Sequence, residues 1–286
     1  MKEDVYRRIR ERSGELSRAQ KKVAAYIEKH PDVAPFLTAA RMAEKSGVAE
    51  ATVVRFAVAL GYSGYTEMQR SLQDGIRERI TTVERLDLAD NLYPEESRVA
   101  FEVLSDDINN LHQTMSRLHG ETFAEAVRRI STAGKIRVIA FRSSHALGYF
   151  LTFYLQLILQ NTELIDNSDT MFERLSVLGK EDLVIGIGFP RYTHRTVQAL
   201  QFARSRGVPS ICLTDTGSSP LARETDVCLL ASSRLPSYVD SFTAPLSLLN
   251  GLLTAVGRDV KEHASRRLSE MEGLWEREGI YYPEEN

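Results

Sequence analysis

Apolar positions in the first part of the chain recur at the three- and four-residue spacing of amphipathic helices. Ser17 is placed to cap the first clear helix, and Pro31 ends it. Gly61 ends a later one. The pattern predicts four helices, over 17–30, 38–45, about 50–60 and 62–80.

A short turn around Gly47 separates the second of these helices from the third. A helix, a tight glycine-containing turn and another helix are the parts of a helix-turn-helix unit. Ala43 and Val48 are expected to pack the two helices together, with Val53 and Val54 in the same small core. The same arrangement is common in helical bundles, so spacing alone leaves the role of this hairpin open.

The pattern weakens over 81–93, where we place a linker, and two more helices are expected near 94–118 and 122–133. After Gly134 the chain alternates short apolar runs with helical segments. This alternation predicts a parallel sheet covered on both faces. The expected strands are 135–141, 182–188, 208–214 and 226–230, with 162–166 as a further candidate, and the expected helices are 144–160, 193–206 and 237–274.

Composition places the chain among soluble proteins of ordinary make-up. Its 286 residues suit two domains, and the longest apolar run, 149–159, is too short for a membrane span and contains Gln156. The charged N-terminus does not resemble a secretory signal. Cys212 and Cys228 lie in apolar runs. We interpret them as buried thiols of a cytoplasmic protein without a membrane partner.

Charge is distributed unevenly along the chain. The net charge is −3, but residues 1–80 carry 15 basic and 11 acidic side chains, a balance of +4, and the remainder carries −7. A basic head on an acidic body favours an anionic polymer as the partner of the N-terminal part. The difference is small enough that charge alone decides nothing.

In a helix-turn-helix unit, the second helix enters the DNA major groove by its N-terminal residues. Arg55 suits a bidentate contact to guanine or a phosphate contact, and Thr52 suits a base or a phosphate. The residues expected to face DNA are Lys45, Ser46, Glu50, Ala51, Thr52 and Arg55.

The run from Ala39 to Phe56, followed by Leu60-Gly61-Tyr62-Ser63-Gly64-Tyr65, resembles the N-terminal domain of the MurR/RpiR family of bacterial transcriptional regulators. The resemblance covers about residues 1–80 and implies that Thr52 and Arg55 contact DNA. The chain departs from the family pattern at Ala49, where a serine cap is usual. It also lacks the lysines often found at 57–59.

The same resemblance implies a C-terminal sugar isomerase (SIS) domain, a doubly wound sheet that usually binds phosphosugars. Residues 134–265 resemble its layout, so we expect a domain over 1–80, a linker over 81–93 and a SIS-like domain over 94–286. The fold class is therefore an all-α helix-turn-helix domain followed by an α/β doubly wound parallel sheet.

Ligands of such folds bind at the carboxyl ends of the strands. The family's first loop reads Gly-x-Gly-x-Ser, and this chain has Ala140 and Arg142 in place of the glycines and keeps Ser144. Its second loop reads Ser-x-Ser-Gly-x-Thr, and here it is Gly188-Phe189-Pro190-Arg191-Tyr192-Thr193. A third strand end, 214–220, resembles the domain's later loop.

The two arginines place cations where the family has glycines, and arginine pairs bidentately with phosphate or carboxylate. We therefore expect a small anionic effector, either a phosphosugar or a carboxylate, although both arginines could instead face solvent or pair with acidic neighbours. The expected effector residues are Arg142, Ser143, Ser144, His145, Arg191, Tyr192, Thr193 and His194.

The histidines are not expected to be catalytic. His145 and His194 stand at predicted helix starts without paired carboxylates, and His112, His119 and His263 are scattered. We expect no catalytic residue, no metal and no cofactor.

Together these patterns predict a transcriptional regulator, a repressor by family habit, that binds operator DNA as a homodimer or homotetramer. Helices near 94–118 and 237–274 are candidates for the interface. Two rivals remain open: a sugar-phosphate isomerase with an accessory helical domain, and a module whose N-terminal helices contact protein.

Overall fold

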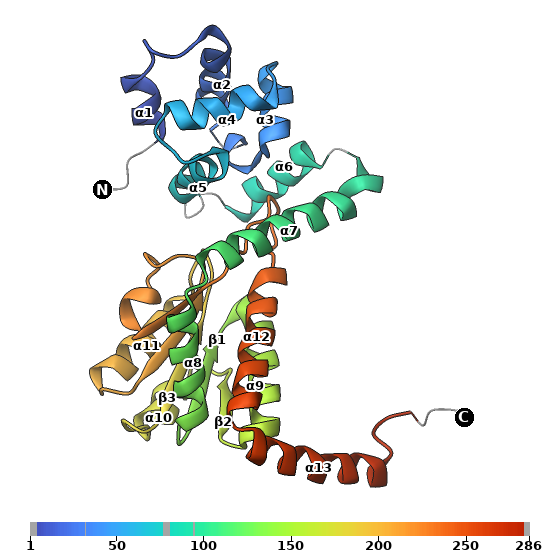
Figure 1. The fold of residues 1–286 in the computed structure, drawn as a ribbon. Coiled ribbons are helices and arrows are strands. Elements are labelled where there is room, and N and C mark those ends of the chain that lie inside the picture. Colours follow the sequence, from blue (N-terminus) through green and yellow to red (C-terminus); the bar gives the residue numbers. More distant parts are fainter. Residues whose placement is uncertain (1–4, 32, 77–80, 94, 283–286) are drawn as a thin grey trace. The chain divides into compact units, whose positions relative to one another are not determined.

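The computed structural model describes residues 5–31, 33–76, 81–93 and 95–282, and it divides the chain into two compact units (Figure 1). The first comprises Met1–Ser105 with Leu235–Asp240, and the second comprises Asp106–Arg234 with Ser241–Asn286. The region expected to be a linker, 81–93, forms a capped helix inside the first unit.

The first unit is entirely helical, as the apolar spacing predicts. Ser17 and Gln20 form a reciprocal capping box, and the Thr38 hydroxyl accepts a hydrogen bond from the Arg41 N–H at 3.2 Å. Both caps satisfy N–H groups that the first helical turn leaves without a partner. Its helices are α1 (Val5–Glu11), α2 (Arg18–Lys29), the 3₁₀ turn η1 (Ala34–Phe36), α3 (Ala39–Ser46), α4 (Glu50–Ala59), α5 (Tyr65–Ile76) and α6 (Thr82–Leu92).

The helix-turn-helix core forms largely as expected. Ala43 and Val53 are buried, and Val48 packs against the same cluster. Val54, predicted to share this core, is instead 40% exposed. Phe56 takes the place in this core that was predicted for Val54, because it lies on the same side of α4 as Val53 and is fully buried.

The second unit alternates strands and helices. A 3₁₀ turn, η2 (Glu96–Arg98), leads into the long helix that carries the chain into this unit. Its elements are α7 (Val99–Arg117), α8 (Gly120–Thr132), β1 (Ile136–Ala140), η3 (Arg142–Ser144), α9 (His145–Leu159), β2 (Thr162–Ile165), α10 (Met171–Ser176), β3 (Leu183–Ile187), α11 (His194–Ser205), β4 (Ser210–Thr214), η4 (Ala222–Glu224), β5 (Val227–Leu230), α12 (Thr243–Asp259) and α13 (Lys261–Glu278).

Five parallel strands form one sheet in the order β2-β1-β3-β4-β5. The candidate strand over 162–166 is confirmed as β2, and the helix expected over 237–274 is two helices, α12 and α13, that meet at Val260. The chain goes from β1 to one side to form β2 and returns to the other side to form β3. Such a reversal opens a crevice beside the carboxyl ends of the two strands that flank it.

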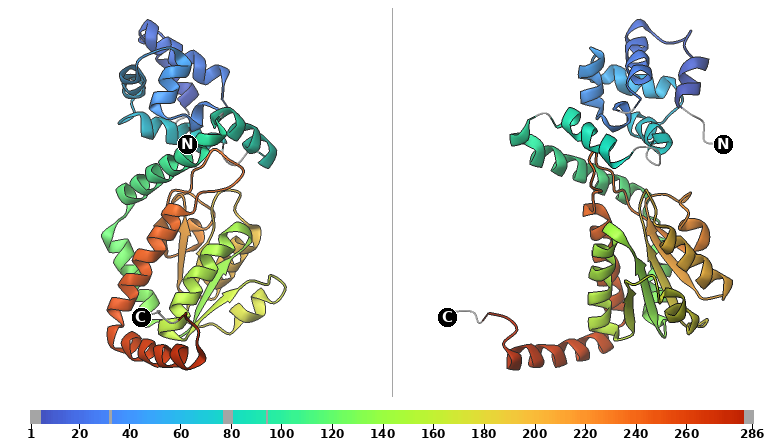
Figure 2. Two further views of the ribbon diagram at one scale, coloured as in Figure 1. Left: turned by 90° about the vertical axis from the view of Figure 1, so that its right-hand side faces the viewer. Right: turned by 180° about the vertical axis from the view of Figure 1, so that it is seen from behind.

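Helices cover both faces of the sheet, as the continuous apolar strands require (Figure 2). On one face α8, α9 and α12 pack into a core that includes Ile136, Leu151 and Leu252. On the other face α10 and α11 form a second core around Val184 and Leu200. The sheet is thus the middle of three layers.

Both cysteines keep free thiols on neighbouring strands, where Cys212 is in register with Cys228. Cys212 is buried as expected, but Cys228 is only half-buried, so that part of the prediction is wrong. No helix in the described part of the chain is long and apolar enough to cross a membrane.

Gly148 lets helix α9 lie close against β1. A Cβ atom at this position would stand 2.6 Å from the Ala140 Cβ and 3.1 Å from the Leu164 Cδ1. Ordinary carbon contacts are 3.5–4.0 Å, so a side chain here forces the helix away from the sheet.

We expect Gly148→Ala to lower the free energy of unfolding by about 1–3 kcal/mol, although alanine favours helices over glycine. Urea denaturation followed by circular dichroism measures this change in the free energy of unfolding. Gly257→Ala, in α12 with no atom within 4 Å of the added Cβ, is the matched control and should not destabilise. Equal stability of Gly148→Ala and wild type would disprove the close approach.

Candidate functional site

The turn between α3 and α4 is built around Gly47. Its φ of 63° is the left-handed conformation that glycine adopts without penalty. The Val48 N–H donates to the Ala43 carbonyl oxygen at 3.0 Å, which closes the end of α3. At the start of α4, Ala49 provides no side-chain cap, so the first N–H groups of that helix point outward without a side-chain acceptor at the cap.

The outer face of α4 combines a cation with small apolar side chains. Glu50, Ala51 and Arg55 are exposed, as predicted for a DNA-reading helix. Thr52 is half-buried and lies at the margin of this face. Of the predicted polar residues of α4, Glu50 and Arg55 are exposed, and Arg55 is the cation among them.

Sequence reasoning missed two members of this face, Val54 and Val58, which are 40% and 53% exposed. They lie one turn apart on the exposed side of α4. Val54 lies in the middle of α4, and Val58 lies in its last turn. Their spacing from the buried Val53 and Phe56 was the signal that could have revealed them.

The two predicted turn residues, Lys45 and Ser46, differ in the surroundings of their side chains. Lys45 is exposed at the end of α3. The Ser46 hydroxyl donates to the Met42 carbonyl oxygen within its own helix, the back-bonding common for helical serine. Its hydroxyl must leave this bond before it binds a phosphate.

The two loops expected to hold an effector follow β1 and β3, which are hydrogen-bonded neighbours in the sheet. The structure therefore brings both loops to the same carboxyl edge, at the point where the strand order reverses. Arg142 has a φ of 57° and Arg191 a φ of 65°. These two arginines have a left-handed backbone at two of the three loop positions where the family pattern has glycine.

The predicted hydroxyl and histidine residues lie directly beside these arginines. Ser143 is exposed and Ser144 is buried in η3, while Thr193 is the N-cap residue of α11, with no side-chain cap bond. His145 and His194 are the first residues of α9 and α11. Two helices thus begin at this edge, where N–H groups and the helix dipole favour an anion.

Asp215 joins this edge from the end of β4, and the sequence analysis did not single it out. The Tyr192 hydroxyl donates to the Asp215 carboxylate at 2.6 Å. Arg117, at the end of α7, donates to the Asp215 carbonyl oxygen at 3.2 Å. Tyr192 is therefore oriented by an acidic partner, and α7 is bonded to a loop of the candidate effector edge.

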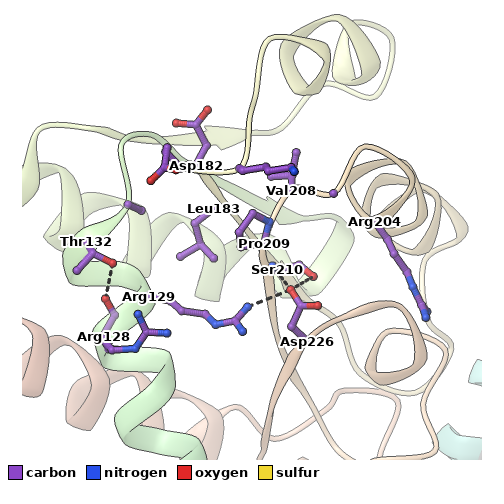
Figure 3. Close-up of a pocket in the computed structure, with 14 residues that line it drawn as sticks. Arg128, Arg129, Thr132, Asp182, Leu183, Arg204, Val208, Pro209, Ser210 and Asp226 are labelled. Carbon is purple, nitrogen blue, oxygen red and sulfur yellow. Dashed lines mark hydrogen bonds and ion pairs between the residues drawn. The ribbon is translucent and has the colours of Figure 1, made fainter.

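A cavity of about 470 Å³ lies at the opposite edge, beside the first residues of β3 and β4 (Figure 3). The Asp226 carboxylate accepts hydrogen bonds there from the Ser210 N–H at 2.8 Å and from Arg129 at 3.0 Å. Arg128 and Arg129 hydrogen bonds also lower the pKa of Glu125 to about 2. None of the residues expected to bind the effector lines this cavity.

Among residues 5–31, 33–76, 81–93 and 95–282, no group of three or more His, Cys, Asp or Glu side chains could hold a metal ion.

Comparison with known proteins matches each of the two units to a known domain family. The helix-turn-helix domain model of the rpiR family matches residues 4–78, and the SIS domain model matches residues 129–255. The HTH-type transcriptional regulator HexR of Pseudomonas aeruginosa is 27% identical over 280 residues, which cover 92% of this chain and 94% of HexR.

Two solved structures are also similar. The sugar isomerase domain of an RpiR transcription factor from Sphaerobacter thermophilus is 32% identical, with a TM-score of 0.60, and the match covers 61% of this chain and 98% of that one. The Vibrio vulnificus NanR protein complexed with ManNAc-6P is 20% identical, with a TM-score of 0.58 and coverage of 95% and 98%. The NanR match shows the fold alone.

These matches define a class of regulator in which a helix-turn-helix domain is joined to a SIS domain. The chain belongs to the RpiR family of transcriptional regulators. The predicted family and fold class are confirmed.

The positive φ angles of Arg142 and Arg191 lead to a prediction about the stability of the protein. At an ordinary helical position alanine is more stable than glycine by about 0.5–1 kcal/mol. At a positive φ a side chain costs about 1–2 kcal/mol, so the order reverses. We expect Arg142→Gly and Arg191→Gly to unfold at higher urea concentration than Arg142→Ala and Arg191→Ala. Arg195, in the first turn of α11, is the control, and there the alanine variant should be the more stable.

Proposed function

We propose that the protein binds operator DNA through the outer face of α4 and represses the genes beside that operator. The exposed Arg55 and the small side chains around it support this role, because they leave α4 free to enter a major groove. Lys45 is the proposed phosphate contact at the turn, and Thr52 is a contact from the margin of the face. The Ser46 hydroxyl contacts a phosphate once it breaks its hydrogen bond to the Met42 carbonyl oxygen.

We expect Arg55→Ala to weaken binding to DNA from upstream of the gene by about 10- to 100-fold, the loss of one bidentate contact. Fluorescence anisotropy with a labelled duplex measures it. Arg10→Ala removes the same charge from an exposed position of α1, and it should weaken DNA binding less than Arg55→Ala does. An unchanged affinity for Arg55→Ala would favour the rival in which these helices contact protein.

We propose further that the edge formed by the β1 and β3 loops binds a small metabolite through its phosphate or carboxylate group. The observation that carries this proposal is the pair of left-handed arginines at adjacent strand ends. Strained backbone persists where the surrounding structure holds it, and it clusters at ligand sites. The NanR complex with ManNAc-6P supports a sugar phosphate as the first compound to test.

Within this site, Arg142 and Arg191 would pair with the anionic group, and Ser143, Ser144 and Thr193 would donate hydroxyls beside the helix N-termini. Tyr192, oriented by Asp215, and the histidines His145 and His194 would contact the rest of the molecule. We propose these roles for all eight residues.

We expect Arg142→Ala and Arg191→Ala each to weaken effector binding by about 10- to 100-fold, the value of one charge-assisted hydrogen-bond pair. The probes are ManNAc-6P, other hexose phosphates and sugar acids, tested by thermal shift. DNA affinity without effector should be unchanged, and Arg195→Ala, an exposed arginine of α11, is the control. An unaltered response in both variants would contradict an anion site at this edge.

We also propose that the protein acts in the cytoplasm as a homodimer or homotetramer without catalytic turnover. His145 and His194 occupy helix starts, which suits hydrogen bonding to a ligand rather than proton transfer. Incubation with phosphosugars and analysis of the mixture tests the enzymatic rival. Formation of any isomerised product would support that rival and contradict this proposal.

A further inference from the structure

The end of α1 and the first turn of α2 lie beside the second half of α4. Gln20 donates from its side-chain amide to the Arg55 carbonyl oxygen at 3.4 Å. Arg12, directly after α1, donates to the Ala59 carbonyl oxygen at 2.6 Å, and Arg8 donates to the next carbonyl oxygen at 2.9 Å. Three side chains from outside the helix-turn-helix unit therefore contact the backbone of the helix proposed to read DNA.

The basic surplus of the N-terminal part of the chain comes from this same segment. Residues 5–22 carry seven basic and two acidic side chains, a balance of +5, which exceeds the balance of +4 for residues 1–80 as a whole. Helix α4 contributes nothing to the surplus, because its only charged side chains are Glu50 and Arg55. The positive charge typical of a nucleic-acid-binding surface thus lies beside the reading helix and not on it.

Three cations of this segment are accessible to a ligand, and we call them the corner patch: Arg12, Arg18 and Lys22. All three are exposed. Arg18 and Lys22 lie one turn apart on the side of α2 that faces away from the buried Val23 and Ile27. Across the described part of the chain, no carboxylate pairs with any of the three side chains.

The contact of Arg12 with α4 leaves most of its guanidinium group accessible. This group has five N–H donors in a planar fork. Arg12 uses one Nη atom on the Ala59 carbonyl oxygen, and its other donors remain for a second acceptor. The neighbouring Glu11 does not neutralise it, because that carboxylate pairs with Arg7 at 2.7 Å.

A cation at this place favours DNA binding for two physical reasons. The carboxyl end of a helix carries a partial negative charge, which repels phosphate. In addition, the second half of α4, residues 56–59, has no charged side chain of its own. The guanidinium group of Arg12 offsets the first effect and provides a phosphate ligand where the helix offers none.

We infer that the corner patch binds phosphates of the DNA backbone beside the groove that α4 enters. The inference rests on the proposed DNA binding and deepens it, because α4 would read bases while the patch supplies affinity that does not depend on sequence. DNA fits the patch better than an acidic protein does, since Arg12 is bonded to the reading helix itself. A duplex that meets α4 therefore also meets the patch.

The test is the salt dependence of DNA binding by the full chain without effector, measured by fluorescence anisotropy. One labelled duplex carries the DNA upstream of the gene, and the other has the same length and a scrambled sequence. Arg12→Ala and Arg18→Ala should each make the slope of log K, the association constant, against log salt shallower by about 0.9. At about 0.1 M salt this change weakens binding to both duplexes by about eightfold.

Arg10→Ala and Lys29→Ala are the matched controls, because each removes one positive charge from the same two helices. Arg10 lines the groove between α1 and α2, and Lys29 is exposed in the last turn of α2. Both variants should keep the wild-type slope. Arg12→Lys retains the charge and should also keep it.

Arg18→Ala keeps the test decisive if loss of the Arg12 hydrogen bond unfolds α1, because the Arg18 side chain forms no hydrogen bond among the described residues. Circular dichroism monitors folding of every variant. Unchanged slopes for both patch variants, an equal loss in both controls, or a weakening confined to the upstream duplex would overturn the inference.

Arg55→Ala separates this inference from the proposed function. It should weaken binding to the upstream duplex more than binding to the scrambled one, since a base contact depends on sequence. If Arg55→Ala behaves in this way while both patch variants match the wild type, the proposed function stands and only the corner patch is disproved. Shallower slopes for the patch variants with no effect of Arg55→Ala would contradict the role of α4 and support the patch.

Discussion

The parallel arrangement of β1 between β2 and β3 is the constraint on which the second unit depends. Parallel neighbours cannot be joined by a tight turn, so each connection must cross over and return to the same edge. Because the chain leaves β1 into α9 on one face and β3 into α11 on the other face, the loops after these two strands diverge at the carboxyl end. Arg142, Arg191 and Asp215 lie at the same edge because they follow the carboxyl ends of β1, β3 and β4, although up to 73 positions separate them in the sequence.

The two arginines show how a loop can keep its backbone path while its chemistry changes. Glycine at a left-handed position costs nothing in strain, and arginine there costs about 1–2 kcal/mol. The fold accepts this cost at both strand ends and obtains two guanidinium groups at the crevice. This edge therefore presents side-chain cations where the family pattern leaves bare backbone N–H groups, and the proposed anion site rests on that difference.

Helix α7 is bonded to loops at the carboxyl edge of the sheet. Its residues Asn110, Thr114 and Arg117 form hydrogen bonds to the segments that follow β4 and β5. An effector that favours one arrangement of those loops would bias the position of α7, and a helix transmits such a shift as a rigid body. Coupling of this kind requires only that the effector bind two arrangements with different affinity.

The sequence by itself determined the helix-turn-helix unit, the alternation of strands and helices and the cap at Ser17, because these features depend on local spacing and local hydrogen bonds. The prediction that Val54 shares the core was wrong although the sequence held the answer, because the three- and four-residue steps from Val53 to Phe56 and Ala57 leave Val54 off the buried face. Strand order, and the arrival of the loops of Arg142 and Arg191 at one edge of the sheet, were decided by the tertiary structure. These depend on which distant segments lie side by side, and no local pattern encodes that.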